Sequence, residues 1–189
     1  MKILYLDVIE SFTSLNICKK YLTSQIIRMP NCWFVAYVWG AMRITVMNKT
    51  ENNIKKYGWE AMYVFDEHGE KEPFLYTIGL EETYSHPEIL IFGLKRETMH
   101  NIVSDIVHDI KNGFKAPINE KVGELLSGNF EVLFKPVIDN HFDDYLGHAN
   151  RYYKKSFRAL VMFWPDKNNI LPTEENCQVN VQDEALKIV

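Results

Sequence analysis

The chain has 189 residues, which is enough for one domain with a sizeable core and short for two. Apolar residues make up 47% and charged residues 24%, and the formal charge is −4, as is typical of a soluble globular protein. Basic residues occur in runs no longer than pairs such as Lys154–Lys155, which argues against nucleic acid as a partner. The three cysteines show no paired spacing, which favours free thiols in a reducing cytoplasm.

The first 46 residues differ in composition from the remainder. They carry five basic and two acidic side chains, a charge of +3, which leaves −7 for the rest of the chain. Their apolar stretch, residues 32–42, is shorter than the roughly 20 residues of a membrane-spanning helix. We favour an N-terminal extension over residues 1–46, followed by a single globular domain over residues 47–189. An extra element covering a sheet edge, and membrane association through residues 32–42, are the two alternatives.

Three strands open the predicted domain. Residues 59–66 alternate, with Trp59, Ala61, Tyr63 and Phe65 as the apolar face. A charged turn leads to a second strand over residues 74–80. Residues 88–94 are apolar on both faces, which predicts a strand buried centrally in a sheet.

Helical and extended patterns alternate in the second half. Apolar residues recur at helical spacing from Met99 to Ile110. Strands are predicted over residues 129–137 and 157–164, with a second helix over residues 139–155 between them. The sequence therefore predicts the α+β class: one twisted, mostly antiparallel sheet of about five to six strands with two helices packed on it.

Several short motifs occur in a family-like order: "KKYGW", "FLYTIGL", "HPEILIFGL", "YLGHANRYY" and "WPDKNNILP". In this order they resemble the bacterial domain-of-unknown-function family 4262, over roughly residues 53–186. The sequence departs from the family pattern at Met162, where the resemblance implies glutamine, and at Thr173, where it implies tryptophan. The resemblance implies a fold but no activity and no cofactor.

One candidate metal site is a stripe along the predicted second helix. His141, Asp144 and His148 lie at steps of three and four residues, with Tyr152 four residues further on. Imidazole and carboxylate groups one turn apart can share a metal ion. His141 and His148 are two turns apart, about 10 Å along the axis, so a solvated polar edge is the favoured alternative.

A second candidate site is the turn between the second and third strands. His86 and Glu88 lie beside Thr77, and a histidine next to a carboxylate is a workable general base. The same residues can instead close the turn by hydrogen bonds around Pro87, which is the interpretation that we favour. Catalytic candidates are therefore His86, Glu88 and Thr77.

The aromatic content suggests a binding surface. Tyrosine and tryptophan combine an apolar ring with a polar group, as suits pockets and interfaces. The predicted ligand-binding residues are Tyr76, Tyr145, Tyr152, Trp164 and Asp166.

Nucleotide-binding and hydrolase motifs are lacking in the sequence. We therefore expect a bacterial, cytoplasmic ligand-binding or protein-interaction module with an aromatic-lined pocket. Its partner is an unidentified protein or small molecule, and homo-oligomer formation stays open. The alternative is a small enzyme with an acid–base or metal site built from histidine, aspartate and glutamate.

Overall fold

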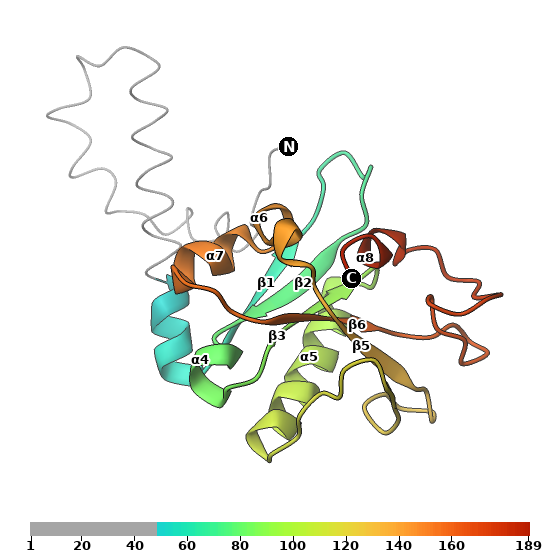
Figure 1. Cartoon of the computed structure of the whole chain (residues 1–189), viewed down its shortest axis with the longest axis horizontal. Coiled ribbons are helices and arrows are strands. Elements are labelled where there is room, and N and C mark those ends of the chain that lie inside the picture. The colour runs from blue at the N-terminus through green and yellow to red at the C-terminus, as the bar shows by residue number, and fades with distance from the viewer. Residues whose placement is uncertain (1–48) are drawn as a thin grey trace, which may run out of the picture.

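The computed structural model describes residues 49–189 (Figure 1). The predicted extension over residues 1–46 and its apolar stretch at 32–42 lie outside the described residues. The described part begins with a helical segment over residues 49–57, which leads into the sheet. In residues 49–189 there is no helix with the length and apolar character needed to cross a membrane.

Six strands form one mixed sheet in the order β1-β2-β3-β6-β5-β4. All neighbouring strands are antiparallel except β3 and β6, which are parallel. This confirms the predicted α+β class with a single, mostly antiparallel sheet. The strands are β1 (Glu60–Val64), β2 (Phe74–Ile78), β3 (Glu88–Phe92), β4 (Lys121–Val122), β5 (Val132–Pro136) and β6 (Ala159–Phe163).

The two parallel strands form the buried centre of the sheet. Every residue of β3 and of β6 is buried, because helices cover both faces of the sheet there. This confirms the central strand that the apolar run predicted. The prediction for β1 was wrong about the more buried face: Met62 and Val64 are buried, whereas Ala61 and Tyr63 are only partly covered. The reason is that β1 is an edge strand, where the side of Met62 and Val64 faces the larger of two hydrophobic clusters.

The helices divide between the two sides of the sheet (Figure 1). Helix α5 (Arg96–Lys111) packs Met99, Val103 and Ile106 on one side, as its apolar period predicted. Helices from the second half of the chain cover the other side. The hydrophobic side chains that they bury form a cluster separate from the one that contains α5. These helices are α6 (Phe142–Tyr145), α7 (Gly147–Tyr153) and α8 (Asp183–Leu186).

The predicted continuous helix over residues 139–155 is wrong. The segment starts with a 3₁₀ turn, η3 (Asp139–His141), and is interrupted between α6 and α7. At the interruption Leu146 has φ −115° and ψ 23°, and its side chain is fully buried. Gly147 has a low helix propensity, so interrupting the helix there costs little free energy. The burial of the Leu146 side chain outweighs that cost. The residues of the predicted stripe therefore do not share one helical face.

The predicted polar turn between β2 and β3 contains a short helix, α4 (Leu80–Tyr84). The chain enters it through Gly79, whose φ of 110° is open to glycine and costly for other residues. A Cβ atom at position 79 would lie 2.9 Å from the carbonyl oxygen of Gly58. Glycine at this position thus allows the close approach of the two backbone segments.

Candidate functional site

A carboxylate with no exposed surface lies where β2, β3 and α7 meet. Glu88, the first residue of β3, accepts a hydrogen bond from the Thr77 hydroxyl at 2.6 Å and another from the Tyr153 hydroxyl. The backbone amides of Gly79 and Glu81 also donate to Glu88 Oε1, at 3.0 and 3.1 Å. The Gly79 amide donates in addition to the Tyr153 oxygen, at 2.8 Å. Glu88 therefore ties the start of α4 and the end of α7 to the sheet.

The electrostatics of this group follow from burial. Removal from water raises the pKa of Glu88, and the hydrogen bonds from Thr77 and Tyr153 oppose that rise only in part. Burial, followed by the neighbouring Glu88 charge, also raises the pKa of Tyr153, so its hydroxyl keeps its proton. Because Glu88 has no exposed surface, a substrate would reach it only if the turn around α4 moved.

His86 is engaged separately from Glu88. Its Nε2 accepts the Ala116 N–H at 3.2 Å, so Nδ1 carries the proton and donates to the Pro87 carbonyl at 2.7 Å. Burial lowers the pKa of His86, which favours this neutral form. Ala116 packs with the α5 cluster, whereas Tyr153, the partner of Glu88, belongs to the opposite cluster. The catalytic candidates Thr77 and Glu88 thus lie together, and His86 uses both ring nitrogens to hold the turn.

A pocket of about 370 Å³ opens elsewhere on the same side of the sheet as Tyr153. Its floor consists of Phe74 on β2 and Phe92 on β3, whose rings stack at 4.9 Å between centroids. The Tyr145 ring of α6 tilts over both, at 5.6 and 5.9 Å. Phe74 is 8% and Phe92 1% exposed, so the Tyr145 ring supplies most of the aromatic surface that a planar apolar group could contact.

Charged side chains surround this aromatic floor. They come from three separated segments: the turn between β1 and β2, the α6 region and the α8 region, whose ribbons lie near one another in Figure 1. Four carboxylates face two lysines, a formal excess of two negative charges, with His141 beside them. The charged residues are Asp66, Lys71, Glu72, Asp144, Glu184 and Lys187. We call the whole the aromatic pocket.

Tyr145, Glu184 and Lys187 form one wall of the aromatic pocket. The Tyr145 hydroxyl donates to Glu184 Oε2 at 3.1 Å, and Lys187 Nζ lies 2.6 Å from Glu184 Oε1. Burial, followed by the hydrogen bond to Glu184, raises the pKa of Tyr145 to about 12. The hydrogen bond from Lys187 lowers the pKa of Glu184, which therefore stays ionised. At neutral pH this wall combines a phenol donor with an ion pair.

The three metal candidates separate in the structure. His141 and Asp144 line the aromatic pocket, but His148 is buried on α7, with Nε2 3.1 Å from the Thr50 hydroxyl. Burial lowers the pKa of His148 to about 4, so the ring is neutral at physiological pH. Within residues 49–189, no three His, Cys, Asp or Glu side chains are grouped as metal ligands.

The five predicted ligand-binding residues also occupy different places, and only Tyr145 lines the aromatic pocket. Tyr76 is 1% exposed in the core, and Tyr152 donates to Glu82 on the surface at 2.8 Å. The Trp164 indole donates to the Phe92 carbonyl at 2.9 Å. Asp166 accepts backbone amides of residues 168, 170 and 178, so it organises the loop after β6.

Sequence reasoning missed most of the pocket. Phe74 and Phe92 lie in the predicted strands 74–80 and 88–94, but the sequence does not show that their rings border a pocket. Glu184 and Lys187 lie in the polar tail, where no periodic pattern singles them out.

A family model described as Domain of unknown function (DUF4262) matches residues 53–178. The chain belongs to this family. The match confirms the resemblance that the sequence motifs predicted. No curated protein and no solved structure shows a significant match to the chain.

The DUF4262 match covers the strands and α5, α6 and α7, but it ends before α8. The wall formed by Glu184 and Lys187 therefore lies beyond the matched region. Met162 and Thr173, the two departures from the family pattern, do not line the aromatic pocket: Met162 is buried in the α5 cluster, and Thr173 is exposed. Neither departure alters the chemistry of the pocket directly.

Proposed function

We propose that the chain is a binding module for a small organic cation with an aromatic ring. The observation that carries the proposal is the aromatic pocket, in which the rings of Phe74, Phe92 and Tyr145 lie beneath an acidic rim. Its volume of about 370 Å³ is within the range of small-molecule sites. The proposal includes a bacterial cytoplasmic location, which the free thiol of Cys177 supports.

The charge of the rim supports a cationic ligand over an anionic one. Among residues 49–189, Asp66 and Asp144 form no ion pair with a lysine, whereas Glu184 is already engaged by Lys187. Backbone amides of residues 70 and 68 lower the pKa of Asp66, which keeps this carboxylate ionised. An ammonium group entering the pocket would find carboxylates at the rim and the partly exposed Tyr145 ring beside them, both of which attract cations.

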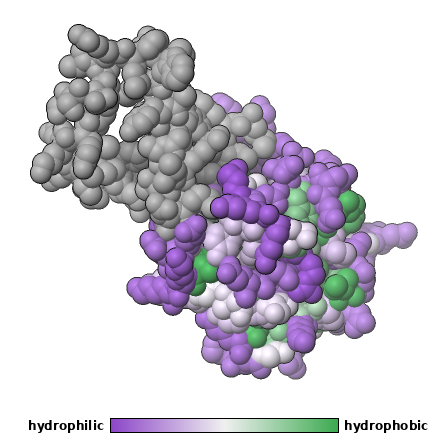
Figure 2. Space-filling model, turned by 60° about the vertical axis from the view of Figure 1, so that its left-hand side comes forward, coloured by the Kyte–Doolittle hydropathy of each residue, from purple (hydrophilic) through white to green (hydrophobic). Residues whose placement is uncertain are grey.

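A small ligand fits this chain better than a large apolar partner surface. The described surface visible in Figure 2 is mainly hydrophilic, and its apolar side chains form separate small patches. Extended protein interfaces need a contiguous apolar core, which this face does not offer. The enzyme alternative has less support, because Glu88 is inaccessible and both nitrogens of His86 are engaged.

The test compares two probes with the same ring and opposite charge. We expect phenethylamine to shift the NMR signals of residues around the aromatic pocket at lower concentration than phenylacetate. Asp144→Asn should weaken phenethylamine binding about fivefold, because it removes one rim charge. Asp105→Asn is the matched control, since Asp105 is exposed on α5 across the sheet. Equal affinity for the two probes would refute the proposal.

A further inference from the structure

A second pocket, of about 620 Å³, lies on the α5 side of the edge strand β1. The helical segment 49–57, β1 and α5 supply its lining, and no residue is shared with the aromatic pocket. We call it the basic pocket. Ala61 and Leu75 of its lining belong to the α5 cluster, whereas Glu60 alternates with Ala61 and lies on the side of Met62 and Val64, so the basic pocket extends around the edge of β1.

The charge of the basic pocket is opposite to that of the whole chain. Its lining carries Lys49, Lys56, Arg96 and Lys111 against the single carboxylate of Glu60, a formal charge of +3 in a chain of −4. Of the ion pairs among residues 49–189, none involves any of the three lysines. Basic groups gathered from both ends of α5 and from residues 49–57 produce a local positive potential that attracts anions.

Aromatic side chains lie among these cations. Trp59 and Tyr63 present rings from β1, and the Trp59 ring lies 6.2 Å from that of His100 on α5. Tyr57 is 54% exposed at the end of the helical segment, which is unusual for a residue of its size. Exposed rings beside cations are the means by which proteins stack and hold anionic heterocycles.

Glu60 supplies the most specific observation. Its Oε1 accepts the Asn53 amide at 2.9 Å, but its Oε2 is buried and has no hydrogen-bond partner in the described part of the chain. A buried carboxylate oxygen without a donor is costly, and native structures seldom retain one. A ligand carrying an N–H group would satisfy it. The basic pocket thus combines attraction for an anion with one acceptor for a neutral donor.

We infer that the basic pocket binds a mononucleotide. The phosphate would lie among the lysines, the base would stack on the exposed ring of Tyr57 or on Trp59, and an N–H of the base would donate to Glu60 Oε2. Neither an inorganic anion nor an uncharged heterocycle uses all three features. The ligand is therefore a phosphate and a base in one molecule.

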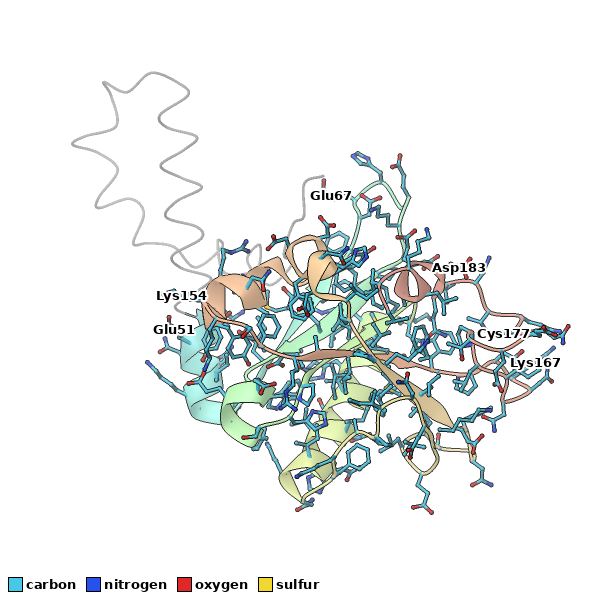
Figure 3. The ribbon with its side chains drawn as sticks, viewed as in Figure 1. Glu51, Glu67, Lys154, Lys167, Cys177 and Asp183 are labelled. Atoms are coloured by element: carbon cyan, nitrogen blue, oxygen red, sulfur yellow. The ribbon has the colours of Figure 1, made fainter. Side chains whose placement is uncertain are left out.

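The experiment uses the full chain and guanosine 5′-monophosphate as the probe, with calorimetry at low salt. We expect guanosine and inorganic phosphate each to bind at least about tenfold more weakly than the nucleotide. Lys111→Glu should weaken nucleotide binding about tenfold, and Glu60→Gln about fivefold. Lys167→Glu is the control, because Lys167 lies on the loop after β6, at the opposite side of Figure 3 from Glu51, whose helical segment lines the basic pocket.

Three results with guanosine or its monophosphate would overturn the inference. They are guanosine binding as tightly as its monophosphate, Lys167→Glu weakening binding as much as Lys111→Glu, and no binding of the nucleotide at millimolar concentration. Tighter binding of a single-stranded RNA oligomer would also overturn it, since the ligand would then be a polymer. Thermal unfolding of each variant, compared with that of the parent chain, checks that it is folded.

Discussion

Two adjacent tyrosines on α7 allow the buried Glu88 group to be tested by the same chemical change. In Tyr153→Phe the hydroxyl that donates to Glu88 is lost, while the ring keeps its contact with Phe157, 4.7 Å away between centroids. In Tyr152→Phe the lost hydroxyl donated to Glu82, an exposed carboxylate. The two substitutions differ mainly in whether the carboxylate is buried.

The expected magnitudes follow from that difference. A hydrogen bond to a buried charged group contributes about 1.5–3 kcal/mol, so Tyr153→Phe should lower the free energy of unfolding by that amount. The Gly79 amide keeps its bond to Glu88 at 3.0 Å, so no further group is left without a partner. Tyr152→Phe should cost about 0.5 kcal/mol or less, because water replaces the lost partner.

The destabilisation caused by Tyr153→Phe should also change with pH in a predictable direction. Burial raises the pKa of Glu88 above its ordinary value of 4.5, so its contribution to stability is fully present below pH 4.5 and is lost as pH rises through the folded pKa. The Tyr153 hydrogen bond opposes this rise by favouring the ionised form. Without it the folded pKa of Glu88 is higher still, so the cost of Tyr153→Phe should increase with pH above 4.5.

Urea unfolding of both variants and of the parent chain between pH 4 and pH 8 measures these free energies. Equal losses for the two variants, or a cost of Tyr153→Phe that falls with increasing pH, would refute the account of Glu88 as an ionisable anchor.

Two further predictions concern stability. Gly79→Ala should destabilise the fold by several kcal/mol in thermal unfolding, because the new Cβ would lie 2.9 Å from the Gly58 carbonyl oxygen. Gly69→Ala is the control: Gly69 has φ 68° but no atom within 4 Å of the new Cβ, so its cost should be about 1 kcal/mol. Similar losses for the two variants would argue against the close approach at Gly79. Burial lowers the pKa of His148 from 6.5 to about 4. The neutral ring therefore contributes about 3 kcal/mol to the free energy of unfolding above pH 6.5, and this contribution is lost as the pH falls toward 4. His148→Gln should therefore flatten the acid loss of stability that urea unfolding measures between pH 4 and pH 8.

The fold could be predicted because its elements carry local signals. Helix α5 follows from an apolar period that needs no knowledge of distant residues, and β3 from a run that is apolar on both faces. The second helix could not be predicted in detail. Its break at Leu146 depends on tertiary burial, which the local spacing of His141 and His148 does not reveal.

The candidate sites were harder to predict for the same physical reason. The aromatic pocket combines Phe74, Phe92 and Tyr145 with Glu184, four residues from separate segments. Their meeting is a result of strand order and of how the C-terminal helix docks, and neither has a local pattern. Thr77 and Glu88 lie next to each other because a short connection joins their strands, whereas His86, which was grouped with them, bonds to Pro87 and Ala116.

The single parallel pairing in the sheet has a consequence for how the chain folds. Strands β1, β2 and β3 are successive antiparallel neighbours within residues 60–92, so this half can form through contacts close in sequence. Within the sheet, this half joins the remaining strands through the pairing of β3 with β6, where Leu90 lies opposite Val161. These two residues are separated in sequence by more than a third of the chain length. Closing so long a loop is entropically costly, and the compensating burial of apolar surface is complete only when helices cover both faces of the sheet at β3 and β6. Formation of this seam is therefore the expected rate-limiting event, and core substitutions along it should slow refolding more than those in β1.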